Sequence, residues 1–116
     1  MIDDDKNHLT MTRSFLEEDY DVRTSASCEE ALKLLYRGLN PVYILLDLIM
    51  PDVSGWDTYE QIRDISKLHK VPIAIYTSSE DPADREHARA MGAADYIKKP
   101  CKKSELLERV KKNISK

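Results

Sequence analysis

The sequence predicts an α/β domain in which a parallel sheet is covered by helices on both faces. Short apolar runs with the length of buried strands alternate along the chain with longer segments that have helical periodicity. Single helices between strands indicate crossover connections, which place neighbouring strands parallel to one another. Because 116 residues are the length of one domain, we expect residues 1–116 to form a single domain.

Three short runs rich in apolar residues predict buried strands, because each is too short for most helices. They cover residues 42–46, 73–76 and 94–97. Tyr20 and Val22 alternate with polar neighbours, a pattern that favours an edge strand. Met1 and Ile2 precede a run of acids and indicate the end of a first strand. The chain therefore contains five candidate strand segments.

Five segments have the apolar spacing of helices. They are roughly residues 7–18, the segment between Ser27 and Gly38, roughly residues 56–66, the segment between Asp81 and Gly92, and a last segment that begins near Ser104. Ser27 with Glu30 three residues later is a capping box, and Pro82 directly after Asp81 is a favoured first helical residue. The apolar stripe expected on the last helix consists of Leu107, Val110 and Ile114.

Composition and charge exclude several classes of protein. Two cysteines are too few for a disulfide scaffold, and no stretch approaches the roughly 18 apolar residues of a membrane span. The chain opens with acids and not with a signal peptide, so we expect a cytoplasmic protein without membrane contact. Residues 59–116 hold 13 basic and 9 acidic residues, but no aromatic residues interleave with the basic run at the C-terminus. A solvated helix face is therefore expected there, and not direct nucleic-acid binding.

Polar side chains follow the predicted strands at the point where each strand ends. They are Asp3, Asp4, Asp47, Thr77 and Lys99. Because the carboxyl ends of parallel strands lie at one edge of a sheet, we expect these side chains to meet there. Residues 1–58 also hold 12 acidic against 5 basic residues, an excess that points to a bound cation.

Carboxylates that converge on one point repel one another unless a cation joins them. Mg²⁺ is the expected ion, because it binds one or two protein carboxylates together with waters and phosphate oxygens. Asp4 and Asp47 would ligate the ion directly and Asp3 through water. The backbone carbonyl of Ile49, two residues past Asp47, could also point inward.

The same residues have the chemistry to hold a phosphoryl group. Lys99 supplies a positive charge and Thr77 a hydroxyl donor, so that with the metal each phosphoryl oxygen would find a partner. A carboxylate at the centre of such a site can itself accept the phosphoryl group and form an aspartyl phosphate. Asp47 is therefore the candidate nucleophile.

Four segments together resemble, in order and spacing, the receiver domain of two-component response regulators. They are residues 2–5 (Ile-Asp-Asp-Asp), residues 45–55, residues 72–77 and residues 92–100, which end in Lys-Lys-Pro. The resemblance covers nearly the whole chain and implies a doubly wound, five-stranded parallel sheet of order 2-1-3-4-5, the flavodoxin-like arrangement of CheY. Because this family has about four or five apolar residues before its acidic pair, the first strand of this chain is expected to be truncated.

The resemblance implies a role for each site residue. Asp47 would accept a phosphoryl group from a histidine of a sensor kinase or phosphotransfer protein, and Asp3 and Asp4 match the acids of the metal site. Thr77 and Lys99 match the hydroxyl and the lysine that contact the phosphoryl group, and the bond after that lysine, to a proline, is usually cis in the family. The protein would then be a signalling module, and not an enzyme with a separate substrate.

A switch is also implied by the resemblance. Thr77 would move toward the phosphoryl group, and Tyr96 matches the aromatic side chain that fills the vacated space. The surface of the fourth helix, last strand and last helix would change shape and bind a downstream effector or a second copy of the chain. Ile49 and Ser79, near the mouth of the site, are expected to tune the lifetime of the phosphoryl group.

Two other functions fit part of the pattern. A degenerate receiver that binds partners without phosphorylation is suggested by the short first strand. A metal-dependent phosphohydrolase with an aspartyl intermediate would need a second aspartate, as general acid, two residues after Asp47. Ile49 occupies that position, which argues against the phosphohydrolase.

Overall fold

The computed structural model describes residues 1–50, 54–65 and 68–114. In these ranges the helices are α1 Lys6–Leu16, α2 Cys28–Tyr36, α3 Gly55–Arg63, α4 Pro82–Met91 and α5 Lys103–Ile114. The strands are β1 Ile44–Leu46, β2 Ile73–Thr77 and β3 Asp95–Lys98. All five predicted helices and the three predicted apolar strands are confirmed, with ends that shift by up to three residues.

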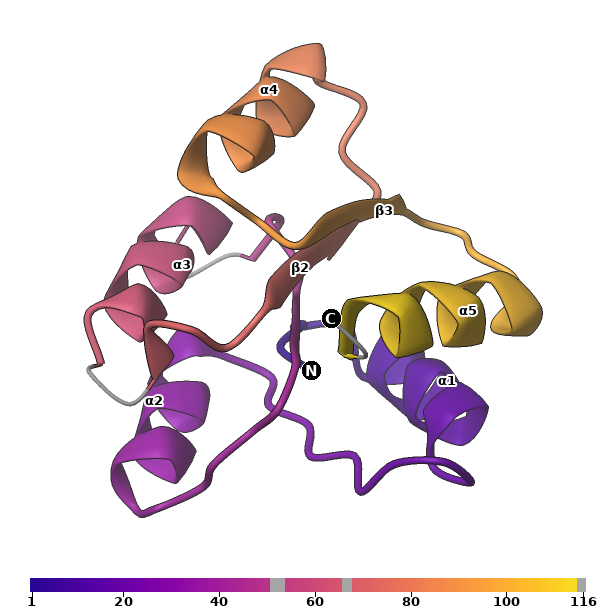
Figure 1. The fold of residues 1–116 in the computed structure, drawn as a ribbon, viewed down its shortest axis with the longest axis horizontal. Coiled ribbons are helices and arrows are strands. Elements are labelled where there is room, and N and C mark those ends of the chain that lie inside the picture. Colours follow the sequence, from indigo (N-terminus) through magenta and orange to yellow (C-terminus); the bar gives the residue numbers. More distant parts are fainter. Residues whose placement is uncertain (51–53, 66–67, 115–116) are drawn as a thin grey trace.

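The three strands form one parallel sheet in the order β1-β2-β3. Ile44 pairs with Ile73 between β1 and β2, and Ala74 pairs with Asp95 between β2 and β3. Figure 1 shows α1 and α5 on one face of this sheet and α2 and α3 on the other. Each face carries its own apolar core, so the α/β class with helices on both faces is confirmed.

The predicted five-stranded sheet is not formed by the described residues. In place of the first two strands, Ile2 makes isolated parallel bridges to Ser25 on one side and Leu46 on the other. The Ile2 N–H donates to the Leu45 carbonyl at 2.8 Å, and the Asp47 N–H donates to the Ile2 carbonyl at 2.9 Å. In the described residues this pairing is limited to Ile2, in agreement with the short first strand expected from the sequence.

The edge strand predicted at Tyr20 and Val22 is wrong. The chain turns after α1, and it reaches the sheet only at Ser25, whose N–H donates to the Met1 carbonyl at 2.9 Å. Alternation of apolar and polar residues over 20–23 therefore reflects packing against the core of α1 and α5, where Tyr20 and Val22 are partly buried. Residues 20–23 alternate as a strand would, but they have no neighbouring strand long enough to pair with them.

A cavity of about 340 Å³ lies beside these bridges, bounded by the 20–25 segment, α2 and the start of β1. Apolar side chains from both cores line it, including Leu16, Leu35 and Leu45. Met1 also lines this cavity, and its N-terminal amine donates to the Arg23 carbonyl at 2.8 Å. Burial lowers the pKa of this amine to about 6, because removing the ammonium group from water disfavours its charged form.

An apolar extension in front of Met1 is expected to stabilise the fold. A Lys-Val-Leu-Val extension would continue the strand, fill the cavity and replace the buried amine with an amide. Each fully buried apolar side chain contributes about 1.5–3 kcal/mol, so we expect a gain of about 2 kcal/mol or more. Urea unfolding measures the gain against a Gly-Ser-Gly-Ser extension of equal length. Equal stability of the two extended proteins would show that the cavity does not accept a strand.

The helix caps follow the sequence signals. The Ser27 side chain accepts the Glu30 N–H at 3.1 Å, and the Asp81 carboxylate accepts the Ala83 N–H at 2.9 Å. Gly92 ends α4 with φ of 78°, a left-handed conformation that favours glycine. These local signals explain why the second and fourth helices begin and end close to the predicted positions.

The stripe predicted on α5 is only partly correct. Its buried side chains are Leu106, Val110 and Asn113, whereas Leu107 and Ile114 are partly buried. Asn113 is a polar residue on the buried face, because its amide donates to the Tyr43 hydroxyl at 3.2 Å and to Asp95 at 3.4 Å. A polar side chain with partners inside the fold is invisible to a count of apolar residues.

Tyr43 is expected to make stability fall at alkaline pH. Burial raises its pKa from 10.0 to about 12, against the opposing hydrogen bond from Asn113. Between pH 10 and pH 12 the unfolded chain loses this phenol proton while the folded chain keeps it, so raising the pH favours unfolding. The free energy of unfolding should therefore fall less at alkaline pH in Tyr43→Phe than in the parent, by about 1–3 kcal/mol. Urea unfolding of both proteins at pH 9 and pH 11.5 measures the difference, and parallel losses would contradict it.

Candidate functional site

Four of the predicted site residues lie at the carboxyl end of a strand or bridge. Asp3 follows the Ile2 bridge, Asp47 follows β1, Thr77 ends β2 and Lys99 follows β3. Because all these segments run parallel, their ends meet at one edge of the sheet. Carboxylate oxygens of Asp3, Asp4 and Asp47 lie within 4.8 Å of one another. The structure therefore brings together the acids that the sequence predicted.

Lys99 joins two of these acids. Its Nζ donates to Oδ2 of Asp3 and, at 3.1 Å, to Oδ2 of Asp47. Asp3 is 0% exposed, and Asp47 and Lys99 are each 6% exposed, whereas Asp4 is exposed. The bond from Lys99 to Pro100 is cis, as the resemblance implies. The centre of the site is thus a buried ammonium shared by two carboxylates, with a third carboxylate at its mouth.

The electrostatics of the pair follow from burial and contact. Burial alone would lower the pKa of Lys99, but the hydrogen bond to Asp3 and the charge of Asp47 raise it above its usual value. Burial raises the pKa of Asp3, although the hydrogen bond from Lys99 opposes this. Lys99 therefore stays protonated and keeps a positive charge at the centre of the site. A lysine of this kind is suited to neutralise negative oxygens that enter the site.

Backbone groups hold the two buried carboxylates in place. The Asp5 N–H donates to Oδ1 of Asp3 at 3.0 Å, and the Ile49 N–H donates to Oδ1 of Asp47 at 3.1 Å. Ile49 is 55% exposed, so its side chain faces solvent. That its carbonyl ligates a metal stays a prediction. In each carboxylate, Oδ1 is therefore held by a backbone N–H, and Oδ2 accepts a hydrogen bond from Lys99.

His8 is a neighbour of the site that the sequence did not indicate. Asp5 caps α1 by accepting the N–H groups of Asn7 and His8. This cap brings His8 into the first turn of α1, where its Nδ1 lies 3.9 Å from Oδ2 of Asp3. Asp5 before the apolar periodicity of α1 is a recognisable N-cap, but nothing in the sequence indicates that the His8 side chain meets Asp3.

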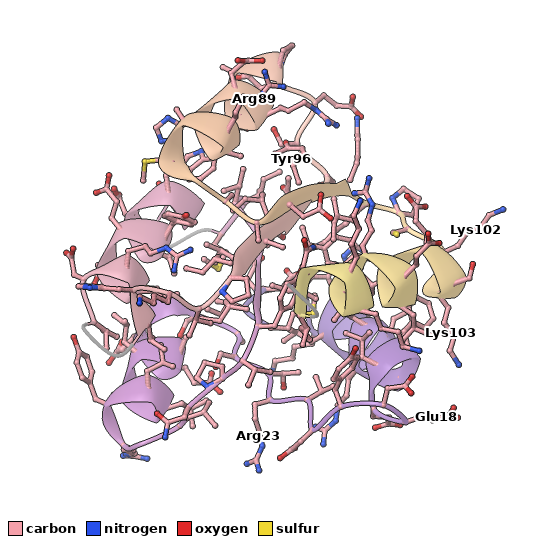
Figure 2. All side chains as sticks on the ribbon, in the orientation of Figure 1. Glu18, Arg23, Arg89, Tyr96, Lys102 and Lys103 are labelled. Atoms are coloured by element: carbon pink, nitrogen blue, oxygen red, sulfur yellow. The ribbon has the colours of Figure 1, made fainter. Side chains whose placement is uncertain are left out.

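Thr77 lies at the site, but Tyr96 lies apart from the acids. Thr77 is fully buried, and its Oγ1 accepts the Ser79 N–H at 3.3 Å. Figure 2 shows Tyr96 between β3 and α4, where the Arg85 guanidinium carbon lies 4.9 Å from the ring centroid. Tyr96 is partly buried against the core of α2, α3 and α4. Its role as a switch stays a prediction.

Gly55 allows α3 to approach the segment that carries Asp47. A Cβ at this position would overlap the Leu48 backbone and lie 2.8 Å from the Asp47 carbonyl oxygen. We expect Gly55→Ala to destabilise the fold by about 1–3 kcal/mol, because backbone atoms cannot yield as a flexible side chain would. Urea unfolding measures the loss, and unchanged stability would mean that the segment relaxes at no cost.

Comparison with known proteins agrees with this geometry. The chain belongs to the response regulator receiver domain family, whose model matches residues 1–111. It is 34% identical over 110 residues to the response regulator SaeR of Staphylococcus epidermidis, a match that covers 94% of this chain and 46% of the relative. The chain therefore spans about half the length of this curated relative.

Solved structures show the same fold. The chemotaxis protein CheY4 of Vibrio cholerae matches with a TM-score of 0.88 and 26% identity over 96% of this chain and 92% of that one. The BeF3-activated receiver domain of DrrB matches with a TM-score of 0.85 and 27% identity over 99% of this chain and 94% of that one. Among the described residues, no helix combines the length and apolar character needed to cross a membrane.

Proposed function

We propose that Asp47 accepts a phosphoryl group from a histidine of a sensor kinase or phosphotransfer protein and thereby switches a signalling surface. The observation that carries this proposal is the ammonium of Lys99 between the buried carboxylates of Asp3 and Asp47. Burying two carboxylates and an ammonium group has a high desolvation cost, and such groups cluster at functional sites. Membership in the receiver family supplies the reaction class.

Asp3, Asp4 and Asp47 fit a divalent cation, because three carboxylates converge on one point and one of them is exposed at the mouth. We assign these residues, with the Ile49 carbonyl, to Mg²⁺. When bound, the ion would neutralise charge on the phosphoryl oxygens. The neighbouring Lys99 carries only one positive charge against three acids, which leaves charge for a cation to balance.

The transfer itself is a displacement at phosphorus. A lone pair on a carboxylate oxygen of Asp47 forms the new O–P bond while the N–P bond to the donor histidine breaks and its electron pair returns to the imidazole. Lys99 then contacts the transferred phosphoryl oxygens from its place beside Oδ2 of Asp47. The buried hydroxyl of Thr77 donates to another phosphoryl oxygen. The protein turns over only its own acyl phosphate, so we class it as a signalling module and not as an enzyme.

Phosphorylation would be read at the surface of α4, β3 and α5. Thr77 moves toward the new oxygens, Tyr96 follows, and the surface between α4 and α5 changes its shape for a protein partner. The partner is an effector or a second copy of the chain, and the setting is the cytoplasm, where sensor kinases present their phosphohistidines. The alternative of a receiver that works without phosphorylation is less favoured, because the buried acids and Lys99 are all in place despite the single-residue pairing of Ile2.

Acetyl phosphate tests the proposed function. We expect the protein, incubated with acetyl phosphate and Mg²⁺, to gain the mass of one phosphoryl group and to lose it again on standing. Chelation of the Mg²⁺ should prevent the gain. A protein that stays unmodified while it remains folded would overturn the proposal and leave the phosphorylation-independent binding module as the better account.

A further inference from the structure

A chain of hydrogen bonds leaves the site through Thr77 and reaches two helices. Oγ1 of Thr77 accepts the N–H of Ser79 at 3.3 Å, and Oγ of Ser79 donates to Oδ2 of Asp84 at 2.5 Å. Oδ1 of the same carboxylate accepts Nε1–H of Trp56 at 3.2 Å. Asp84 lies in the first turn of α4 and Trp56 in the first turn of α3. The chain of contacts therefore ties the end of β2 to both helices.

Both oxygens of Asp84 are engaged, each by a different donor. The Ser79 hydroxyl is engaged as well, because its oxygen accepts the Asp81 N–H at 3.3 Å while its proton goes to Asp84. The Trp56 indole is also held by rings, with its centroid 4.4 Å from that of His87 in an edge-on arrangement. A carboxylate held from two sides fixes the loop that follows Thr77.

The hydrogen bond from the Ser79 N–H affects whether the Thr77 hydroxyl acts as a donor or as an acceptor. Because Ser79 donates its N–H to Oγ1, the lone pair of Thr77 that faces the loop is occupied and its one proton stays available for another acceptor. A hydroxyl that must donate to a phosphoryl oxygen on Asp47 needs this polarity. Asp84 contributes to it without touching the site, since it acts through Ser79.

We propose that Asp84, locked by Trp56 and acting through Ser79, is a positioning residue that presents the Thr77 hydroxyl as a donor to the phosphoryl group on Asp47. The inference rests on the proposed function. Asparagine at position 84 has one acceptor oxygen for two donors, so Asp84→Asn breaks one of the two contacts. Trp56→Phe keeps an aromatic ring beside His87 but removes the indole donor. Losing one such hydrogen bond corresponds to about a fivefold change in rate.

The test measures the rate of phosphorylation by acetyl phosphate from the intact mass. We expect Asp84→Asn and Trp56→Phe each to lower this rate about fivefold, and the double variant to be no slower than either single variant, because both remove the same contact chain. Glu86→Gln is the matched control, since it removes an exposed acid from the same helix, and its rate should equal that of the parent. Ser79→Thr, which keeps the hydroxyl, should remain near the parent rate, whereas Ser79→Ala should be as slow as Asp84→Asn.

The outcomes separate the two claims. A parent protein that takes up no phosphoryl group overturns the proposed function, and with it this inference. A parent that is phosphorylated at the same rate as Asp84→Asn and Trp56→Phe overturns the positioning role alone. Multiplying effects in the double variant would do the same, because they would indicate two independent structural losses. If Asp84→Asn lowers the unfolding midpoint so far that it is not folded in the assay, Trp56→Phe decides between these outcomes.

Discussion

Replacing Asp47 with asparagine is expected to lower phosphorylation by acetyl phosphate at least about a hundredfold, to below detection. The amide keeps the size of the side chain, but it lacks the charged oxygen that would attack phosphorus. Asn also retains an oxygen that can accept from Lys99 or from the Ile49 N–H, so the turn after β1 should persist. Intact mass after incubation with acetyl phosphate and Mg²⁺ measures the effect.

The control for this variant is Asp64→Asn, which removes an exposed carboxylate at the end of α3. It should be phosphorylated to the same extent as the parent protein. Urea unfolding checks that the Asp47→Asn protein is folded. A folded Asp47→Asn protein that still gains one phosphoryl group would mean that another side chain is the acceptor.

Lys99→Met should have the largest effect on stability. The substitution leaves the carboxylates of Asp3 and Asp47 buried without a positive partner, and breaking a buried ion pair in this way costs about 3–5 kcal/mol. Mg²⁺ should restore more stability to this variant than to the parent, because the parent already has an ammonium at the same carboxylates. Urea unfolding with and without saturating Mg²⁺ measures both effects.

Lys98→Met is the matched control, because Lys98 lies next in the chain and pairs with Glu80 at 2.5 Å on the surface. Exposed ion pairs contribute about 0–1 kcal/mol, so this control should change stability little and should not respond to Mg²⁺. Equal losses in the two variants would mean that the buried pair does not neutralise the site. An equal response to Mg²⁺ would argue that the carboxylates do not form the cation site.

The sequence located the site because strand ends are local features. Asp47 follows an apolar run directly, and Lys99 stands between the last apolar run and a proline, so their positions could be assigned without knowing any contact. The parallel arrangement then required that they meet. Burial of Asp3 and the shared ammonium of Lys99 came from the structure alone, because exposure depends on what packs around a residue.

Contacts between distant segments could not be predicted in the same way. Trp56 and Asp84 are 28 residues apart, and nothing in either neighbourhood indicates that the indole meets the carboxylate. Asn113, which the predicted apolar stripe did not include, lies on the buried face of α5, because Tyr43 and Asp95 supply its partners from elsewhere in the fold. Hydrophobic periodicity predicts which face is buried, but it is silent on polar pairs that satisfy one another inside it.

The strands were predicted least completely at the N-terminal side of the sheet. The strands β1 and β2 can be recognised from the sequence, because parallel strands buried on both faces appear as continuous apolar runs. Ile2 is different, because one residue carries the pairing to Ser25 and to Leu46. A bridge of one residue has no periodicity, so patterning cannot locate its partner: the strand predicted at Tyr20 and Val22 does not form, and Ser25 pairs with Ile2 instead.

The most direct test of the account is to locate the phosphoryl group on the chain. Borohydride reduces an aspartyl phosphate to homoserine, so the protein is phosphorylated with acetyl phosphate, reduced, digested and sequenced by mass spectrometry. The account predicts homoserine at position 47 and unmodified aspartate at positions 3, 4 and 52. Homoserine at any other aspartate, or a phosphoryl group that survives on His8, would contradict the assignment of Asp47 as the acceptor.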